Sequence, residues 1–310
     1  MLMIVAVCAA ALNLQHTGDF MPDHTSTVAY TSPYSWLPQG WYSFAANIAA
    51  NVAIAFMLLM INRTYRLMRS ITWIFVGLFF FMQLAQPGVL GYFYGGSFMA
   101  LVMLALTALL FSTYADPALT RSTYLLFFLL TLAALFRYNI IFFLPVFILG
   151  TMQMKTFGMR TLLASIMGIV TPLWILLGFG LLTVDMLHMP VFEPALPDTD
   201  TTARVTSLAT TAFTGGLGLI FTCANLMKVM SYNSARRAFN GFLTLLFLTT
   251  IILIIADHTN YLLYIPLLNT IAAYQTGHFF ATRRYRLSYI PVGIILIIYG
   301  TLAAIPALTP

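Results

Sequence analysis

The chain has 310 residues, of which 61% are hydrophobic and only 7% are charged. A mean hydropathy of +0.91 lies far outside the range of soluble domains, so the composition excludes a soluble protein and indicates an integral membrane protein. The formal net charge of +6 would suggest nucleic-acid binding in a soluble domain, but here the positions of the charges indicate membrane topology, and we expect no nucleic-acid partner.

Long apolar runs recur along the whole chain with short charged breaks, which predicts helices that satisfy their own backbone hydrogen bonds in lipid. We expect an all-α fold, a polytopic transmembrane helix bundle of about ten or eleven spans. In chain order the candidate spans are 2–14, 41–61, 71–86, 96–114, 122–136, 139–154, 161–184, 208–229, 240–256, 260–280 and 287–305.

Several of these runs, 2–14, 122–136 and 139–154 among them, are shorter than the roughly twenty residues that a straight span needs. The run 2–14 also lacks the basic start of a signal peptide, and whether this first span is complete stays open. The runs 122–136 and 139–154 are separated only by two or three residues around Arg137, so they form either a tight hairpin or one long tilted helix.

The basic residues predict the orientation of the bundle. If the N-terminus is cytoplasmic, twelve of the fourteen Lys and Arg residues fall in short inside loops, as the positive-inside rule requires. Only Arg137 and Arg204 fall outside. The inside residues are Arg63, Arg66, Arg69, Arg121, Lys155, Arg160, Lys228, Arg236, Arg237, Arg283, Arg284 and Arg286. We therefore expect a multi-pass membrane protein with a cytoplasmic N-terminus.

The absence of a long linker predicts one membrane domain over residues 1–310, with polar outer loops at 15–40 and 185–207. The two cysteines, Cys8 and Cys223, both lie in apolar runs, which supports neither a disulfide framework nor a thiolate metal site. The sequence does not identify a cofactor.

Arg137 is a single charge within a long apolar stretch, at the predicted outer boundary. One interpretation is a snorkelling side chain whose stem lies in lipid and whose guanidinium reaches the headgroups. The alternative is recognition of an anionic lipid head or a pyrophosphate, because the planar guanidinium binds phosphate in a bidentate manner. Arg204, the other outside arginine, is the second candidate for phosphate binding.

The outer loops carry the carboxylates and imidazoles that general-base chemistry needs. Their spacing matches no known metal motif, so we predict no metal site. One interpretation is a solvated loop surface, and the other is a catalytic role for Asp19 and Asp23, the first-loop acids. The remaining candidates for a shared outer vestibule are His24, Asp185, His188, Asp257 and His258.

Asp257 and His258 lie in a very short predicted outer turn. They are either a helix cap with an interface anchor or part of the vestibule that would join them to the first loop.

Four segments of the chain resemble a family of uncharacterised polytopic inner-membrane proteins of Bacteroidetes. They are NIAANVAIAFMLLMINRTYRLMRS (47–70), LTLAALFRYNIIFFLPVFILG (130–150), MRTLLASIMGIVTPLWILLGFGLL (159–182) and LLYIPLLNTIAAY (262–274). Some members carry the label of carotenoid-cleaving monooxygenase. Iron–oxygen chemistry would need several histidines within the membrane, and this sequence has only His278 at that depth, so we do not carry the label over.

Three hypotheses follow. The first is a protein of cell-envelope assembly that binds membrane lipids, such as a polyprenyl-phosphate-linked intermediate, or partner proteins. The second is a membrane enzyme similar to lipid-dependent glycosyltransferases, in which Asp19 or Asp23 activates the acceptor and Arg137 or Arg204 holds the lipid phosphate. The third is a transporter, which ranks last because Gln83 and Asn225 are too few polar residues within the spans to define a pathway.

Overall fold

The computed structural model describes residues 36–38, 40–68, 73–86, 89–116, 120–181, 202–229, 232–282 and 289–308. The candidate span 2–14, most of the loop 15–40 and the part of the loop 185–207 before residue 202 lie outside these ranges.

Every regular element within the described residues is a helix, as the composition predicts. The α-helices are α2 (Trp41–Tyr65), α3 (Ile74–Leu84), α4 (Gly95–Ser112), α5 (Thr120–Phe136), α6 (Leu144–Gln153), α7 (Met159–Gly178), α8 (Thr202–Val229), α9 (Ser234–Ala256), α10 (Tyr261–Thr282) and α11 (Tyr289–Leu308). Two short 3-10 helices, η2 (Tyr138–Phe143) and η4 (His258–Asn260), lie at turns.

Five of these helices are long and apolar enough to cross a membrane. They are Trp41–Tyr65, Gly95–Ser112, Met159–Gly178, Val205–Lys228 and Ser234–Ala256. Helix α10 has 22 residues but is not among the five, because amide and imidazole side chains interrupt its apolar sequence.

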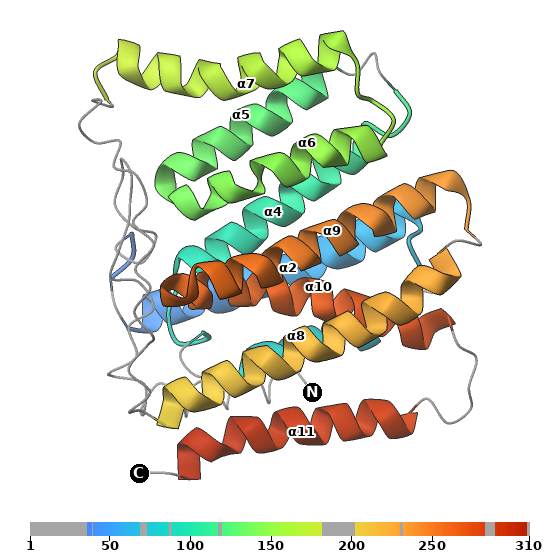
Figure 1. The fold of residues 1–310 in the computed structure, drawn as a ribbon. Helices are drawn as coiled ribbons and strands as arrows, with labels where there is room; N and C mark the ends of the chain where they lie inside the picture. Colours follow the sequence, from blue (N-terminus) through green and yellow to red (C-terminus); the bar gives the residue numbers. More distant parts are fainter. Residues whose placement is uncertain are drawn as a thin grey trace.

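The short runs on either side of Arg137 form a hairpin. Helix α5 ends at Phe136, Arg137 has an extended backbone with φ −143° and ψ 106°, and η2 leads the chain back into α6. The reversal is visible between α5 and α6 in Figure 1. The chain therefore turns at Arg137 and does not continue as one tilted helix.

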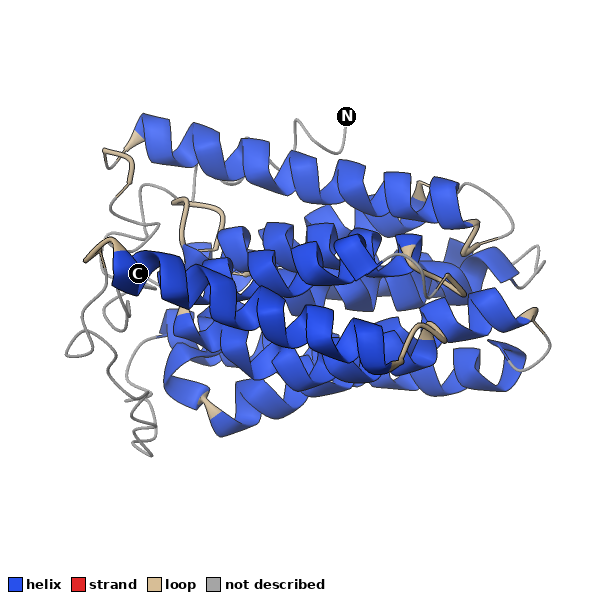
Figure 2. Cartoon of the chain, turned by 90° about the horizontal axis from the view of Figure 1, so that it is seen from above, coloured by secondary structure: helices blue, strands red, loops and turns tan. Residues whose placement is uncertain are grey.

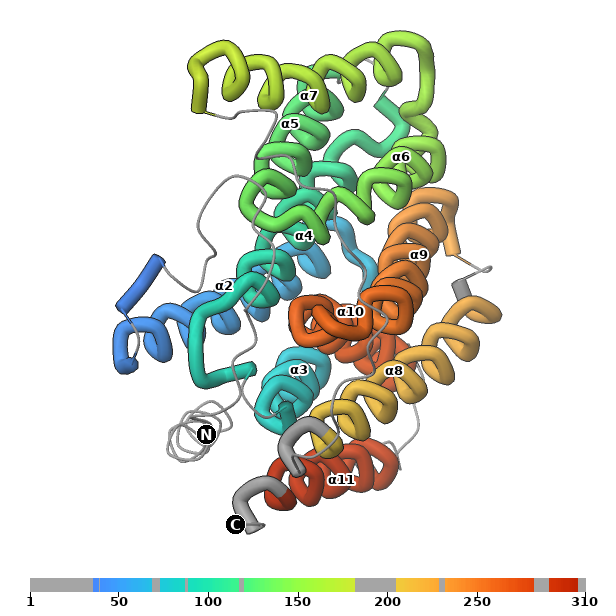
Figure 3. The backbone as a smooth tube through the Cα atoms, turned by 60° about the vertical axis from the view of Figure 1, so that its left-hand side comes forward, coloured from blue at the N-terminus to red at the C-terminus, as the bar shows by residue number. Residues whose placement is uncertain are grey.

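The helices lie side by side along a common direction (Figure 2). Helix α10 lies in the middle and packs against α3, α4, α8 and α9, as the view in Figure 3 shows. Helix α7 lies at one edge, where it packs on α5, and α11 lies at the opposite edge on α8 and α3. Helices α2, α4, α8 and α10 all begin at the end of the bundle that the charge pattern predicts to be the outer one.

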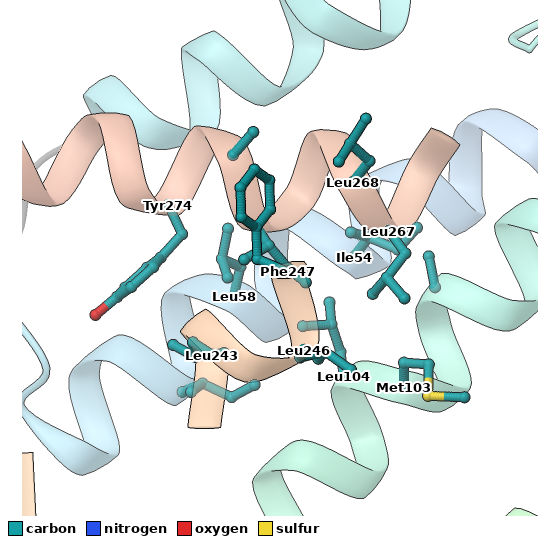
Figure 4. Close-up of a cluster of buried hydrophobic side chains, with 14 of the residues drawn as sticks. Ile54, Leu58, Met103, Leu104, Leu243, Leu246, Phe247, Leu267, Leu268 and Tyr274 are labelled. Carbon is teal, nitrogen blue, oxygen red and sulfur yellow. The ribbon is translucent and has the colours of Figure 1, made fainter. Parts of the chain in front are cut away.

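The centre of the bundle is apolar. Figure 4 shows Ile54 and Leu58 of α2, Met103 and Leu104 of α4, Leu243, Leu246 and Phe247 of α9, and Leu267 and Leu268 of α10 in one cluster. These side chains are all at most 3% exposed. They pack α10 tightly against its neighbours, which fixes the two ends of this helix and the polar groups that it carries.

Candidate functional site

The structure places some of the predicted site residues and not others. Arg137 and Asp257 are buried, and His258 is partly buried. Arg204 lies in the first turn of α8, and nothing is described of its side chain. The candidates outside the described residues are Asp19, Asp23, His24, Asp185 and His188. The candidates with described side chains thus lie at two turns of the chain, at Arg137 and at Asp257.

The Arg137 side chain is enclosed by the bundle, with 1% of its surface exposed. Its guanidinium lies against Gly95, the first residue of α4. A Cβ atom added at Gly95 would lie 2.8 Å from Nη2 and 2.9 Å from Cζ of Arg137, and closer still to Nε. Any larger residue at this position would displace the guanidinium, so glycine at position 95 provides the space in which Arg137 lies.

The start of α4 adds a second positive feature at the same place. Tyr94 precedes the helix in an extended conformation and makes no side-chain cap hydrogen bond within the described structure. The first backbone N–H groups of a helix have no intrahelical acceptor, and the helix dipole is positive there. The guanidinium of Arg137 and the start of α4 therefore make this position electropositive.

Burial of Arg137 does not fit a snorkelling side chain. A snorkelling arginine extends along the lipid boundary toward the headgroups, whereas this guanidinium points into the protein beside Gly95. Arginine stays protonated in proteins, and a buried charge is costly unless hydrogen-bond acceptors or an opposite charge surround it. The structure thus favours a specific role for Arg137 over a simple anchor.

The turn at Asp257 packs directly against the turn at Arg137. The Asn139 amide donates to Asp257 Oδ2 at 2.6 Å and to the Tyr264 hydroxyl at 3.0 Å. The Tyr264 hydroxyl also donates to Oδ2 at 2.9 Å, and the Asn260 amide donates to Oδ1 at 2.9 Å. Asp257 is thus a buried hydrogen-bond acceptor that joins the two turns, and it is not exposed at the membrane boundary as a surface anchor would be.

Tyr264, which bonds Asp257, lies near Arg137, and so does Tyr138. We call the set Gly95, Arg137, Asn139, Asp257 and Tyr264 the Arg137 cluster. It brings together two of the predicted site residues, and sequence reasoning missed Gly95, Asn139 and Tyr264.

The C-terminal end of the loop 15–40 reaches the same part of the bundle. Trp36 packs edge-on against Phe98 of α4 and Phe136 of α5, with ring centroids 5.6 Å and 5.5 Å apart. Phe136 directly precedes Arg137, and Phe98 lies one turn after Gly95. The loop 15–40, which carries the predicted acids, is therefore attached next to the Arg137 cluster at its C-terminal end.

A chain of buried amides extends from this end into the membrane part of the bundle. Ser97 donates to Asn47 Oδ1 at 2.6 Å, and the Asn51 amide donates to the same oxygen at 3.3 Å. The Gln83 amide donates to Asn51 at 2.8 Å, and the Asn269 amide donates to Gln83 at 2.9 Å. Helices α2, α3, α4 and α10 are thus tied together through hydrogen-bonded side chains.

The prediction that the spans contain almost no polar side chains is therefore wrong. Asn47 and Asn51 are four residues apart, the spacing of one helix face, and this signal was available in the sequence. The amides bond mainly to each other, which favours a role in helix packing over a solute pathway.

Metal binding gains no support from the structure. Within the described residues there is no group of three or more His, Cys, Asp or Glu side chains that could hold a metal ion.

Comparisons with protein-family models, with curated proteins and with solved structures found no match.

Proposed function

We propose that this protein is a multi-pass protein of the bacterial inner membrane that binds the anionic head of a lipid-linked intermediate of cell-envelope assembly at its outer face. The observation that carries this proposal is the position of the Arg137 guanidinium, buried against Gly95 at the start of α4. Arginine and the backbone N–H groups at a helix start both bind anions, so their position side by side suits an anionic ligand.

Phosphate is the anion that fits best. The guanidinium offers several N–H donors in a planar fork, and the backbone N–H groups at the start of α4 offer more. Asp257 and Asn139 fix the turn that carries Arg137, so the donors are held in place before the ligand arrives. Since Arg137 is only 1% exposed, an anion reaches the guanidinium only when side chains at this end of the bundle move aside.

A second candidate function is catalysis, as in the lipid-dependent glycosyltransferases. The contact of Trp36 with Phe98 and Phe136 supports it, because it attaches the loop that carries Asp19 and Asp23 next to Arg137. In this mechanism a first-loop carboxylate would accept the proton of the acceptor hydroxyl as its oxygen bonds to the anomeric carbon of the sugar. The bond between that carbon and the phosphate oxygen would break, and Arg137 would hold the polyprenyl phosphate that leaves.

A binding titration tests the proposal. We would place the protein in lipid nanodiscs and titrate a short-chain polyprenyl phosphate, with the uncharged polyprenol as the control ligand. Arg137→Gln should lower the affinity for the phosphate by about thirtyfold or more, because the variant loses the charge and leaves the anion without its partner. Arg137→Lys should give an intermediate loss, because it keeps the charge without the fork.

Two control variants complete the titration. Arg160→Gln removes an exposed charge near the start of α7 and should leave the affinity unchanged. Arg204→Ala should have a smaller effect than Arg137→Ala. Equal affinities for the phosphate in wild type and Arg137→Gln would contradict the proposal.

Turnover and complementation assays of first-loop variants separate binding from catalysis. If the protein is an enzyme, Asp19→Asn or Asp23→Asn should abolish turnover of a sugar-loaded polyprenyl phosphate and leave its binding intact. If the protein only binds the lipid, both variants should complement a deletion strain as well as wild type does.

A further inference from the structure

A second group of polar side chains lies in the other half of α10, away from the Arg137 cluster, where α10 packs against α8. The Asn225 amide of α8 donates to the backbone carbonyl of Gln275 at 2.8 Å and to the Gln275 side-chain oxygen at 3.1 Å. Thr222 lies one turn before Asn225 on α8, and Thr276 follows Gln275 on α10. All four side chains are at most 2% exposed.

The packing around them shows that the four side chains share one interface. Gly218 of α8 faces Ala272 of α10, since a Cβ at Gly218 would lie 3.2 Å from the Ala272 Cβ. The ring of Phe221 of α8 packs against that of Phe279 of α10 in a tilted arrangement, with ring centroids 4.7 Å apart. Gln275 and Thr276 lie one helical turn from both Ala272 and Phe279, and Thr222 lies one turn from both Gly218 and Asn225.

Each of these four side chains has hydrogen-bonding capacity left over. Within the described part of the chain, no partner contacts Thr222 Oγ1, Asn225 Oδ1, Gln275 Nε2 or Thr276 Oγ1. Other buried threonines of the bundle behave differently. Thr107 and Thr131 donate to the carbonyl four residues earlier, Met103 at 2.7 Å and Phe127 at 2.9 Å.

Unused polar atoms in a membrane interior are unfavourable unless a ligand or water satisfies them. The four atoms comprise an amide donor, an amide acceptor and two hydroxyls, and none carries a charge. A group that both donates and accepts hydrogen bonds and is itself uncharged would satisfy them. A hydroxyl has these properties, whereas a phosphate or a metal ion would find no charged partner among the four.

We propose that Thr222, Asn225, Gln275 and Thr276 form a binding site for a neutral hydroxyl-bearing ligand within the membrane part of the bundle. The hydroxyl belongs either to ordered water or to a small organic alcohol or sugar. The site is separate from the Arg137 cluster and does not depend on the function proposed for it.

Replacing each threonine with valine tests the site, because the melting temperature should fall if a ligand is bound and should not fall if the interface is dry. Thr222→Val and Thr276→Val keep the size of each side chain and remove only the hydroxyl. If the hydroxyls are bonded to a ligand, each variant should lower the melting temperature in detergent by several degrees, and Thr276→Ser should retain most of the stability. Thr107→Val and Thr131→Val serve as controls and should have smaller effects.

If the interface is dry, the opposite result is expected. An unbonded buried hydroxyl gains nothing from the protein, so its replacement by a methyl group should leave the melting temperature unchanged or raise it. Unchanged or higher melting temperatures for both Thr222→Val and Thr276→Val would overturn the proposal.

Two further measurements identify the source of the hydroxyl. Pulsed hydroxyl-radical labelling should modify Phe221 or Phe279 if ordered water fills the site, and the Thr222→Val/Thr276→Val double variant should lose this labelling. Phe127 of α5, buried in the apolar core, should stay unlabelled in both proteins. Native mass spectrometry should instead show a small bound neutral molecule if the ligand is organic. Absence of both signals in the wild-type protein would also overturn the proposal.

Discussion

Helices α7 and α10 have similar lengths, 20 and 22 residues, and opposite surroundings. In α10 every residue from Tyr261 to His278 is buried. In α7 only Thr161, Gly168 and Pro172 are buried, and large apolar side chains such as Trp174, which is 76% exposed, face outward. The apolar helix thus lies at the edge of the bundle, and the helix with more polar side chains lies in the middle.

This difference follows from the solvent that each helix meets. A helix in contact with lipid must present apolar side chains, because a polar group there finds no partner. A helix that is enclosed by other helices can carry amides, hydroxyls and imidazoles, because neighbouring side chains supply the hydrogen bonds. Low hydropathy in α10 therefore indicates a protected central position.

The largest expected effect concerns the packing of α10. A Cβ at Gly277 would lie 2.5 Å from the Phe75 Cβ and 3.2 Å from the Phe75 Cα of α3. Because backbone has to move, Gly277→Ala should lower the free energy of unfolding by about 3 kcal/mol. Denaturation in mixed detergent micelles measures this change.

The matched variant on α7 is Gly178→Ala. A Cβ at Gly178 would meet no heavy atom of the described structure within 4 Å. It should leave the stability unchanged or raise it slightly, because alanine favours the helix. Equal losses in the two variants would refute the central position of α10.

The second effect concerns the amide chain. Asn269→Leu removes the donor to Gln83 Oε1 and leaves that buried oxygen unpaired. We expect a loss of about 2 kcal/mol in the free energy of unfolding, measured in the same micelles. The double variant with Gln83→Leu should lose less than the sum of the two single variants, because it removes both partners. Strict additivity would show that the two amides do not interact.

The smallest expected effect lies on the exposed side of α7. Trp174→Leu keeps an apolar side chain at a position that faces away from the bundle. Its free energy of unfolding should stay within about 0.5 kcal/mol of wild type, as for most surface substitutions. A clearly larger loss would indicate that this face of α7 is buried against a partner protein.

Much of the fold could be predicted from the sequence. The ten candidate spans after residue 40 correspond to helices, and the ends differ by a few residues, because a run of apolar residues without charges leaves the backbone no other way to satisfy its hydrogen bonds in lipid. The hairpin at Arg137 depends on the extended backbone conformation of this one residue. A hydropathy pattern does not determine backbone conformation.

The site was predictable only in part. Arg137 and Asp257 could be selected as charges in apolar surroundings. Asn139 and Tyr264, which donate hydrogen bonds to Asp257, are common residue types with no distinctive spacing. The role of Gly95 depends on which helix faces Arg137, and this is a tertiary fact. Likewise, Thr222 and Gln275 lie more than fifty residues apart, and their pairing follows from the packing of α8 on α10.

Native mass spectrometry of the protein purified in mild detergent tests directly whether Arg137 binds the lipid phosphate. Wild type, Arg137→Gln and Arg160→Gln are compared. We expect wild type and Arg160→Gln to retain an anionic lipid, such as a polyprenyl phosphate, and Arg137→Gln to lose it. Equal retention in all three, or no anionic lipid on wild type, would contradict the assignment of Arg137 as the group that binds the lipid phosphate.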